Sequence, residues 1–571
     1  MSRTYALAGD GAAADAVRAA FADADVERAG TGLDAFDAAD VAVVVGLAGR
    51  DGFATANERA RDADVPWIAC EIGGVGGHAV TDVDAAVSAF APDTGCFACL
   101  HRRVAATDPD VADGPRADRA TVRYAGALAG KRALDLLSGG GAGTVVEVPH
   151  AEHAFARAPF CDACGASDRY GDPGRETVDA TLDDAVAKAD SAVDPRAGLV
   201  TDVGERETYP APYYLARTCD TAALGEQSSQ GLAAGVGTDW DDAFVKAVGE
   251  GLERYCAAVY RSADFTLSKP THPDAVAPTE FVRPADAPTP APDDTLQWVP
   301  GTELGTGADV RLPAEFVHFP PPEETHRPAL TTGLGLGNDP VEALLSGLYE
   351  TVERDATMLA WYSTFEPLEL TVDDPAYETL ARRARADGLD VTAVLCTQDV
   401  DVPVVAVAVH RDEWPRLAFG SAAGLDTADA ARGALCEAVQ NWIELRDMGR
   451  DDARAADGAI GDYATDPGAA RDFLDADATV PLADVGPDDP PTDVAELDAV
   501  LERLADAGID AYATDLTTRD VADVGFRAVR VLAPDAQPLF FDDPYFGDRA
   551  RTVPDELGFD ARLDEPHHPF P

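Results

Sequence analysis

Short apolar runs alternate with longer amphipathic segments over the first 150 residues of the chain. The runs at 4–8, 41–46 and 65–70 have the continuous apolar character of buried strands. The segments at 12–24 and 55–63 are typical of helices that pack against such strands. Because strands that alternate with helices usually build a parallel sheet, this pattern predicts an α/β domain at the start of the chain.

Polar and proline-rich stretches mark the predicted loops and surface insertions, at 105–118, 269–300 and 481–491. A further helix is predicted at 120–137. The glycine turn Gly9-x-Gly11 follows the first predicted strand but lacks the third glycine of a dinucleotide-binding fingerprint. It therefore gives only weak support for nucleotide binding in this part of the chain.

Three later segments, at 243–260, 340–362 and 428–446, are predicted helices that carry carboxylates. They contain Glu250-Gly-Leu-Glu253-Arg254, Glu350-Thr-Val-Glu353-Arg354 and Glu437-Ala-Val-Gln440. Residues three positions apart share one helix face. In so acidic a chain a single pair of this kind would often be a solvated surface. The apolar residues around these pairs favour partial burial instead, and buried carboxylates need partners or a metal.

The carboxylate pairs suit Mg²⁺, because this hard ion prefers oxygen ligands and bridges the phosphates of a nucleotide. The arginine after each of the first two pairs adds a forked cation that matches a phosphate. Repeated acids and arginines therefore predict a nucleotide-phosphate site that does not use a Walker loop.

Two Cys-x-x-Cys pairs, Cys96/Cys99 and Cys161/Cys164, stand apart from the other cysteines. Four thiolates in two such pairs can hold one tetrahedral zinc ion and leave no position open for catalysis. A redox dithiol is the alternative, but such a motif normally opens a helix in a thioredoxin-like unit. Structural zinc is the favoured interpretation.

The acidic composition indicates the salt content of the protein's environment rather than the kind of partner that it binds. A net charge of −58 over 571 residues, with a hydrophobic content of 46%, is typical of proteins from salt-accumulating halophiles. In molar salt the Debye length falls to about 3 Å, so self-repulsion is screened. No basic patch favours nucleic-acid binding, no apolar run is long enough to span a bilayer, and no secretory signal opens the chain. A cytoplasmic protein is expected.

The acidic segments, read with their flanks, resemble the YcaO family of ATP-dependent amide-activating enzymes. The family's repeated element, Ser/Ala-x₃-Glu-x-x-Glu-Arg, matches the segments 246–254 and 346–354. The turn Gly335-Leu-Gly337-Asn338 precedes the second element, as it does in the family, and the segment 432–440 resembles the third. The first element departs from the pattern, because Lys246 stands where a small residue is usual; it would reach a phosphate or simply extend to solvent.

The first part of the chain resembles the E1-like, ThiF-related scaffold that accompanies YcaO in azoline biosynthesis and carries a four-cysteine zinc site. The fold class implied is an α/β, degenerate E1-like (Rossmann-like) domain with zinc over residues 1–170. A mixed α+β YcaO domain would follow over residues 171–571. The scaffold usually begins with a winged-helix clamp for a leader peptide; this chain starts on its first strand, so a separate leader-binding protein is expected.

The resemblance implies that a Cys, Ser or Thr side chain of a ribosomally made peptide attacks a backbone carbonyl, whose oxygen ATP then phosphorylates. Glu250, Glu253, Glu350, Glu353 and Glu437 would hold Mg²⁺. Nucleotide or phosphate contacts would come from Arg254, Arg354, Asn338, Ser346, Gln440 and Lys246. Azoline-forming members end in a Pro-x-Pro-x-Pro tail that reaches the active site. Here the tail reads Pro566-His567-His568-Pro569-Phe570-Pro571, with Pro571 and His568 as catalytic candidates and a frayed terminus as the alternative.

Three functions follow from the resemblance. The first is an azoline-forming cyclodehydratase of the kind found in bacteriocin and other thiazole/oxazole peptide biosynthesis. The second is a thioamide-forming enzyme that acts on a protein with a sulfur-delivery partner. The third is a non-catalytic accessory factor for ribosomal-protein methylthiolation. The retained acids argue against a pure scaffold, and a homodimer is the expected assembly.

Overall fold

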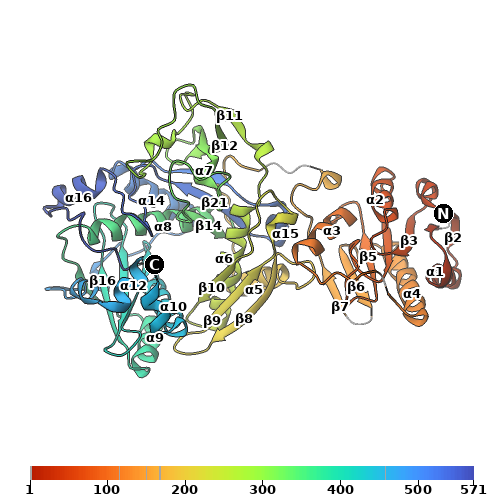
Figure 1. The fold of residues 1–571 in the computed structure, drawn as a ribbon, viewed down its shortest axis with the longest axis horizontal. Coiled ribbons are helices and arrows are strands. Elements are labelled where there is room, and N and C mark those ends of the chain that lie inside the picture. Colours follow the sequence, from red (N-terminus) through yellow and green to blue (C-terminus); the bar gives the residue numbers. More distant parts are fainter. Residues whose placement is uncertain (1–2, 115, 149–150, 166–168, 457, 571) are drawn as a thin grey trace.

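The computed structural model describes residues 3–114, 116–148, 151–165, 169–456 and 458–570. The chain forms a smaller N-terminal α/β body and a larger body that contains the remaining elements. The two bodies are joined end to end along the long axis of the molecule (Figure 1). The larger body carries the three acidic helices (Figure 1).

The N-terminal body is built on a seven-stranded sheet whose strand order is β2-β1-β3-β4-β5-β6-β7. The first four strands run parallel and the last three pairings are antiparallel. The three predicted strands, β1, β3 and β4, are confirmed as parallel neighbours, whereas the antiparallel strands β5, β6 and β7 were not predicted. The strands are β1 (Thr4–Ala8), β2 (Glu27–Thr31), β3 (Val41–Leu47), β4 (Trp67–Ile72), β5 (Ala85–Phe90), β6 (Thr144–Val148) and β7 (Ala151–Ala154).

Helices cover both faces of this sheet, as the continuous apolar strands predicted. One face packs against α1 (Gly11–Asp23) and α4 (Arg119–Leu136). The other packs against α2 (Gly52–Asp62) and α3 (Phe97–Ala106). Helix α3 begins directly after Cys96 and was not predicted, and the loop predicted from 105 begins only after Ala106.

The larger body contains three sheets in the described part of the chain. A three-stranded sheet is formed by β8 (Val200–Glu207), β9 (Tyr213–Thr218) and β10 (Leu232–Val236). A six-stranded sheet contains β11 (Thr266–Ser268), β12 (Leu296–Glu303), β13 (Asp309–Pro313), β14 (Leu334–Gly337), β20 (Tyr512–Asp515) and β21 (Arg527–Leu532). A five-stranded sheet contains β15 (Leu368–Thr371), β16 (Asp390–Leu395), β17 (Val404–His410), β18 (Leu417–Ala423) and β19 (Thr479–Pro481).

The three predicted acidic helices are confirmed to within a few residues as α6 (Trp240–Ala258), α8 (Pro340–Trp361) and α10 (Thr427–Met448). The other helices of this body are α5 (Leu182–Ala192), α7 (Ala314–Val317), α9 (Pro375–Ala386), α11 (Arg450–Ala455), α12 (Gly458–Thr465), α13 (Gly468–Asp472), α14 (Asp493–Asp506), α15 (Arg519–Val524) and α16 (Arg549–Leu557). Within the described residues, none of the helices has the length and apolar character that a bilayer crossing requires.

Each acidic helix belongs to a strand–turn–helix unit: β10–α6, β14–α8 and β18–α10. An aspartate caps the start of each helix by accepting a backbone N–H, and these residues are Asp239, Asp339 and Asp426. In all three units a glutamate follows the capping aspartate by eleven residues. The sequence pattern revealed the similarity between the first two helices, but not this three-fold unit.

A glycine in each strand lets the helix lie directly on it. A Cβ atom on Gly235, Gly335 or Gly420 would come within 2.2 Å, 2.1 Å and 2.3 Å of helix backbone atoms. Real Cβ contacts are never that short, so the close approach of strand and helix requires glycine at these positions. This close packing fixes the position of each glutamate relative to the strand of its unit.

A buried ion cluster joins the two bodies. Arg103 of α3 donates to the Asp520 carboxylate of α15, and the Tyr255 hydroxyl of α6 donates to the same carboxylate at 2.6 Å. The Arg103 and Asp520 side chains are fully buried. The apolar core around them contains residues of both bodies, including Cys99 and Leu252. The helix that carries Cys99 is therefore linked to the helix that carries Glu253 through the side chains of Arg103 and Tyr255.

Candidate functional site

The strand–helix units place three glutamates in the same way. Glu250, Glu350 and Glu437 each accept a hydrogen bond from a backbone N–H of their own strand or of the residue just before it. The donors are Ala234 at 2.8 Å, Gly333 at 3.0 Å and Ser421 at 2.7 Å, respectively. These contacts fix one carboxylate oxygen of each side chain, and the second oxygen of Glu250 is paired with Arg254.

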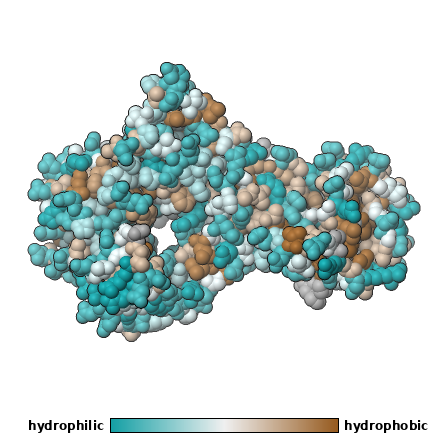
Figure 2. Space-filling view, viewed as in Figure 1, coloured by the Kyte–Doolittle hydropathy of each residue, from teal (hydrophilic) through white to brown (hydrophobic). Residues whose placement is uncertain are grey.

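Glu350 lies at the centre of the cluster. Burial raises the pKa of Glu250, Glu253, Glu353 and Glu437, and the charge of Glu350 raises each of them further, so these four carboxylates lie within electrostatic range of Glu350. The three helices that carry them surround a hollow that is visible in the space-filling view (Figure 2). The structure therefore brings the five predicted acids together.

Burial makes this cluster a poor place for uncompensated charge. Desolvation, reinforced by neighbouring carboxylates, raises the pKa of Glu253 to about 8 and that of Glu353 to about 8. Without a cation these groups would therefore hold protons near neutral pH. A divalent cation would displace those protons and supply the missing positive charge, which is the electrostatic behaviour expected of a metal-binding pocket.

The predicted arginines lie among the acids. The Arg254 guanidinium is 2.6 Å from Glu250, and Arg354 is 3.2 Å from Glu353 and 3.8 Å from Glu350. Arg254 is more exposed than Arg354, with 42% against 13% of its side chain accessible. Arg354 is thus placed to brace the acids, while Arg254 retains freedom to reach an anion.

Two residues of this site were missed by the sequence analysis. The Ser421 hydroxyl donates to Glu353 at 2.7 Å, which links the second and third units. Arg530, on β21, is buried within electrostatic range of Glu253 and Glu350, and burial lowers its pKa to about 9. The sequence does indicate Arg530, because it is a charged residue inside the apolar run Val529-Arg530-Val531.

The other predicted nucleotide contacts are spread over a longer distance. Lys246 and Ser346 are exposed and lie one helical turn before Glu250 and Glu350, on the same face. The Gln440 amide donates to Glu444 at 3.2 Å, one turn after Glu437. Asn338 lies just before the start of α8, whereas the acids lie midway along that helix, and its side chain contacts Glu342 and Lys188.

The C-terminal tail packs beside this site. The Trp361 indole donates to the Pro566 carbonyl at 2.8 Å, and the Phe570 ring contacts Trp361 and Phe419. His568 is buried, and its Nε2 donates to the Phe540 carbonyl at 2.7 Å. Burial lowers the pKa of His568 to about 3, so the ring is neutral and better suited to orient a group than to remove a proton. Pro571 lies outside the described residues.

The spacing of the acids suits a cation that also binds the nucleotide better than one held by protein ligands alone. Among the described residues, only the four cysteines bring three or more ligand atoms within 4.8 Å of one another. Mg²⁺ usually takes only one or two carboxylates and completes its shell with water and phosphate oxygens. The more widely spaced glutamates fit an ion that a nucleotide helps to hold.

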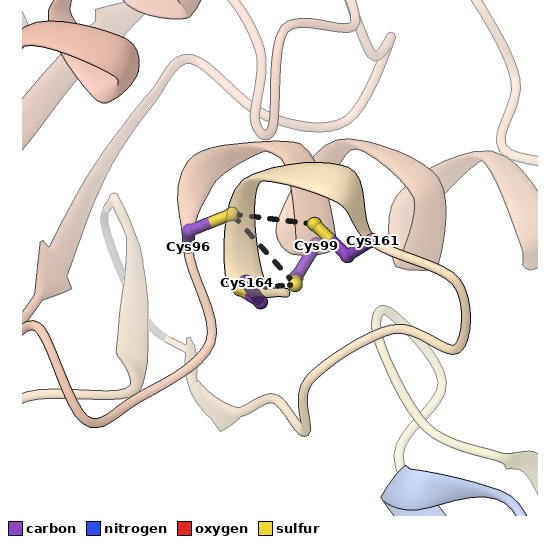
Figure 3. Close-up of side chains that lie close together, drawn as sticks. All are labelled: Cys96, Cys99, Cys161 and Cys164. Atoms are coloured by element: carbon purple, nitrogen blue, oxygen red, sulfur yellow. Dashed lines mark hydrogen bonds between the residues drawn. The ribbon is translucent and has the colours of Figure 1, made fainter. Parts of the chain in front are cut away.

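Cys96, Cys99, Cys161 and Cys164 converge from the start of α3 and a later loop (Figure 3). Their sulfur atoms are 3.8 Å (Cys96–Cys99), 3.6 Å (Cys96–Cys161) and 3.4 Å (Cys99–Cys164) apart. Four sulfurs at about 2.3 Å from one zinc ion would lie about 3.8 Å apart at the corners of a tetrahedron. The cluster thus has the donor set and nearly the spacing of a closed structural zinc site.

We expect purified protein to carry about one zinc per chain, because four thiolates around one point repel one another unless a cation binds them. Metal analysis of the wild type and of Cys161→Ser tests this, with Cys396→Ser as the control, since Cys396 is buried far along the chain from the cluster. Wild-type protein that is folded and metal-free would contradict the expectation.

Comparison with known proteins was consistent with this geometry. A family model described as a YcaO cyclodehydratase that binds ATP and Mg²⁺ matches residues 234–537. An uncharacterized protein of Methanothermobacter thermautotrophicus is 28% identical over 341 residues, which is 57% of this chain and 87% of that protein.

Two solved structures resemble the fold over almost its whole length. A heterocyclase in complex with substrate and cofactor has a TM-score of 0.74 and 18% identity, covering 99% of this chain and 84% of that one. The heterocyclase TruD has a TM-score of 0.65 and 18% identity, covering 98% of this chain and 82% of its own. The likeness extends over the N-terminal body as well as the acidic helices.

Proposed function

Because this chain belongs to the YcaO family of ATP- and Mg²⁺-binding cyclodehydratases, we propose that it converts Cys, Ser or Thr residues of a ribosomally made peptide into azolines. The substrate's thiol or hydroxyl adds to the preceding backbone carbonyl, and the carbonyl oxygen takes the terminal phosphoryl group of ATP. Phosphate then leaves, the amide nitrogen loses its proton, and a five-membered ring with a C=N bond remains.

The observation that carries this proposal is the convergence of four other carboxylates on Glu350. The glutamates would hold Mg²⁺, which neutralises charge on the phosphates during transfer. Arg254 would contact a phosphate, whereas Arg354 and Arg530 would keep the acids ionised. Lys246, Ser346 and Gln440 would line the path of the nucleotide, and Asn338 would act only at its far end.

The N-terminal body would serve as an E1-like scaffold over residues 1–170, held by zinc, with the YcaO domain over residues 171–571. The fold-level likeness to two heterocyclases across both bodies favours the azoline product over a thioamide. A separate protein would present the peptide, and two copies of the chain would form the assembly.

Incubation with ATP, Mg²⁺ and peptides that contain Cys, Ser or Thr tests the proposal. We expect phosphate release that depends on the peptide, with loss of one water per ring by mass spectrometry. Replacement of the peptide's Cys, Ser and Thr by Ala is the control. Product that forms only with added sulfide would indicate the thioamide alternative, and nucleotide binding without turnover on any peptide would indicate the accessory role.

A further inference from the structure

A cavity of about 460 Å³ lies beside the carboxylate cluster. Its walls come from β18, α10, α12 and the C-terminal tail, and they are predominantly apolar. Three large apolar residues at its rim, Met448, Ile460 and Phe541, are 40%, 43% and 62% exposed. Exposed apolar residues that surround a cavity are typical of a binding site.

Two elements, β18 and α10, carry residues of both the cavity and the acidic site. Phe419 lines it and lies two residues before Ser421 on β18, so both side chains project from the same face. Asn441 also lines it and lies one turn after Glu437 on α10. Phe419 and Ser421 are two positions apart on a strand, which corresponds to about 7 Å. The cavity and the carboxylates are therefore separated by a distance of this order.

The charges of the wall leave a small negative excess, because Arg416 offsets one of its two carboxylates. Glu444 lines the cavity at the end nearest Gln440, and Asp542 is exposed at the rim. The volume, by contrast, is ample for one bulky side chain together with the peptide backbone that bears it. An uncharged occupant with a large apolar group fits both the charges of the wall and the volume of the cavity.

Two wall residues also carry buried polar atoms that lack a partner among the described residues, Trp414 Nε1 and His567 Nε2. The indole N–H can only donate. His567 Nδ1 donates to the His568 carbonyl, so Nε2 can only accept. A turn of either ring toward the cavity would let a peptide carbonyl or N–H supply the missing partner, which a hydrocarbon chain cannot do.

We propose that this cavity is the specificity pocket for the peptide substrate, and that it takes an aromatic or large aliphatic side chain within about two residues of the amide being activated. This inference rests on the proposed function, since it assigns the neighbouring carboxylates to that reaction. It adds the class of residue that the peptide must carry beside its Cys, Ser or Thr.

Photo-crosslinking of the full chain tests the pocket without ATP. The probe is a capped tetrapeptide with p-benzoylphenylalanine directly before its Cys. We expect adducts on the segments around Met448, Ile460 or Phe541, at least tenfold competition by the matching Phe-Cys peptide, and little competition by the Asp-Cys peptide. Labelling of other segments, absence of labelling, or equal competition by both peptides would overturn the proposal.

Two variants locate the adduct in the cavity. Ala459→Trp fills it from α12, and Met448→Glu places a charge at its rim; each should reduce labelling at least tenfold. Ala386→Trp adds the same bulk at an exposed position on α9 and should leave labelling unchanged. Labelling that survives both cavity variants would reject the pocket.

Phosphate release separates this inference from the proposed function. If the chain turns over peptides, Ala459→Trp should raise KM about tenfold for the Phe-Cys peptide and not for a Gly-Cys peptide. Pocket labelling without turnover on any peptide would remove the proposed function and leave the pocket. Turnover of both peptides with an unchanged KM in Ala459→Trp would remove the pocket and leave the function.

Discussion

Glu350→Gln should reduce Mg-ATP hydrolysis about 100- to 1,000-fold while the fold is retained. The amide keeps the shape of the side chain and its contact with the Gly333 N–H. It removes the negative charge at the centre of the cluster, which is the group that all four other glutamates share. Loss of one preorganised electrostatic contact to a reacting group usually has an effect of this size.

The measurement is phosphate release at saturating ATP, together with circular dichroism of the folded protein. Glu502→Gln is the matched control, because it makes the same charge change at an exposed position on α14, a helix next to α8. Its activity should equal that of the wild type. Hydrolysis in Glu350→Gln within threefold of the wild type would contradict the assignment of the cluster to Mg-ATP.

The acidic helices were predictable because two local signals coincide in them. Apolar residues at helical spacing give the element, and charged residues interrupting an otherwise apolar stripe mark the face that carries chemistry. That is why α6, α8 and α10 begin and end within a few residues of the predicted segments. The four cysteines were predictable for a similar reason, since the donor set alone restricts the geometry.

Other features depend on long-range pairing that no local pattern records. The antiparallel half of the N-terminal sheet follows from how β5, β6 and β7 return, and their apolar residues would suit either direction. Ser421 is an ordinary polar residue until β18 places it against Glu353. The three-fold unit could not be recognised in the sequence because only three single residues recur in it. These are an aspartate cap, a strand glycine and one glutamate, and the sequence between them differs from unit to unit.

Arg103→Met should lower the free energy of unfolding by about 3–5 kcal/mol, because it leaves the Asp520 carboxylate buried without its cation. Arg103, Asp520 and Tyr255 are almost entirely shielded from water, so solvent cannot replace the lost partner. The same change should weaken Mg-ATP binding, since Tyr255 lies two residues after Glu253 on α6 and loses the hydrogen bond that Arg103 donates to its hydroxyl at 3.4 Å. Denaturant midpoints and nucleotide titration measure the two effects.

Arg157→Met is the control at the same interface. Its ion pair with Asp523 joins the same two bodies, but its side chains are 29% and 28% exposed, so we expect a loss of at most about 1 kcal/mol. The triple change Arg103→Met, Asp520→Leu and Tyr255→Phe removes every buried polar group of the cluster and should recover most of the stability. If Arg103→Met is no more harmful than Arg157→Met, the cluster is not what holds the scaffold to the catalytic helix.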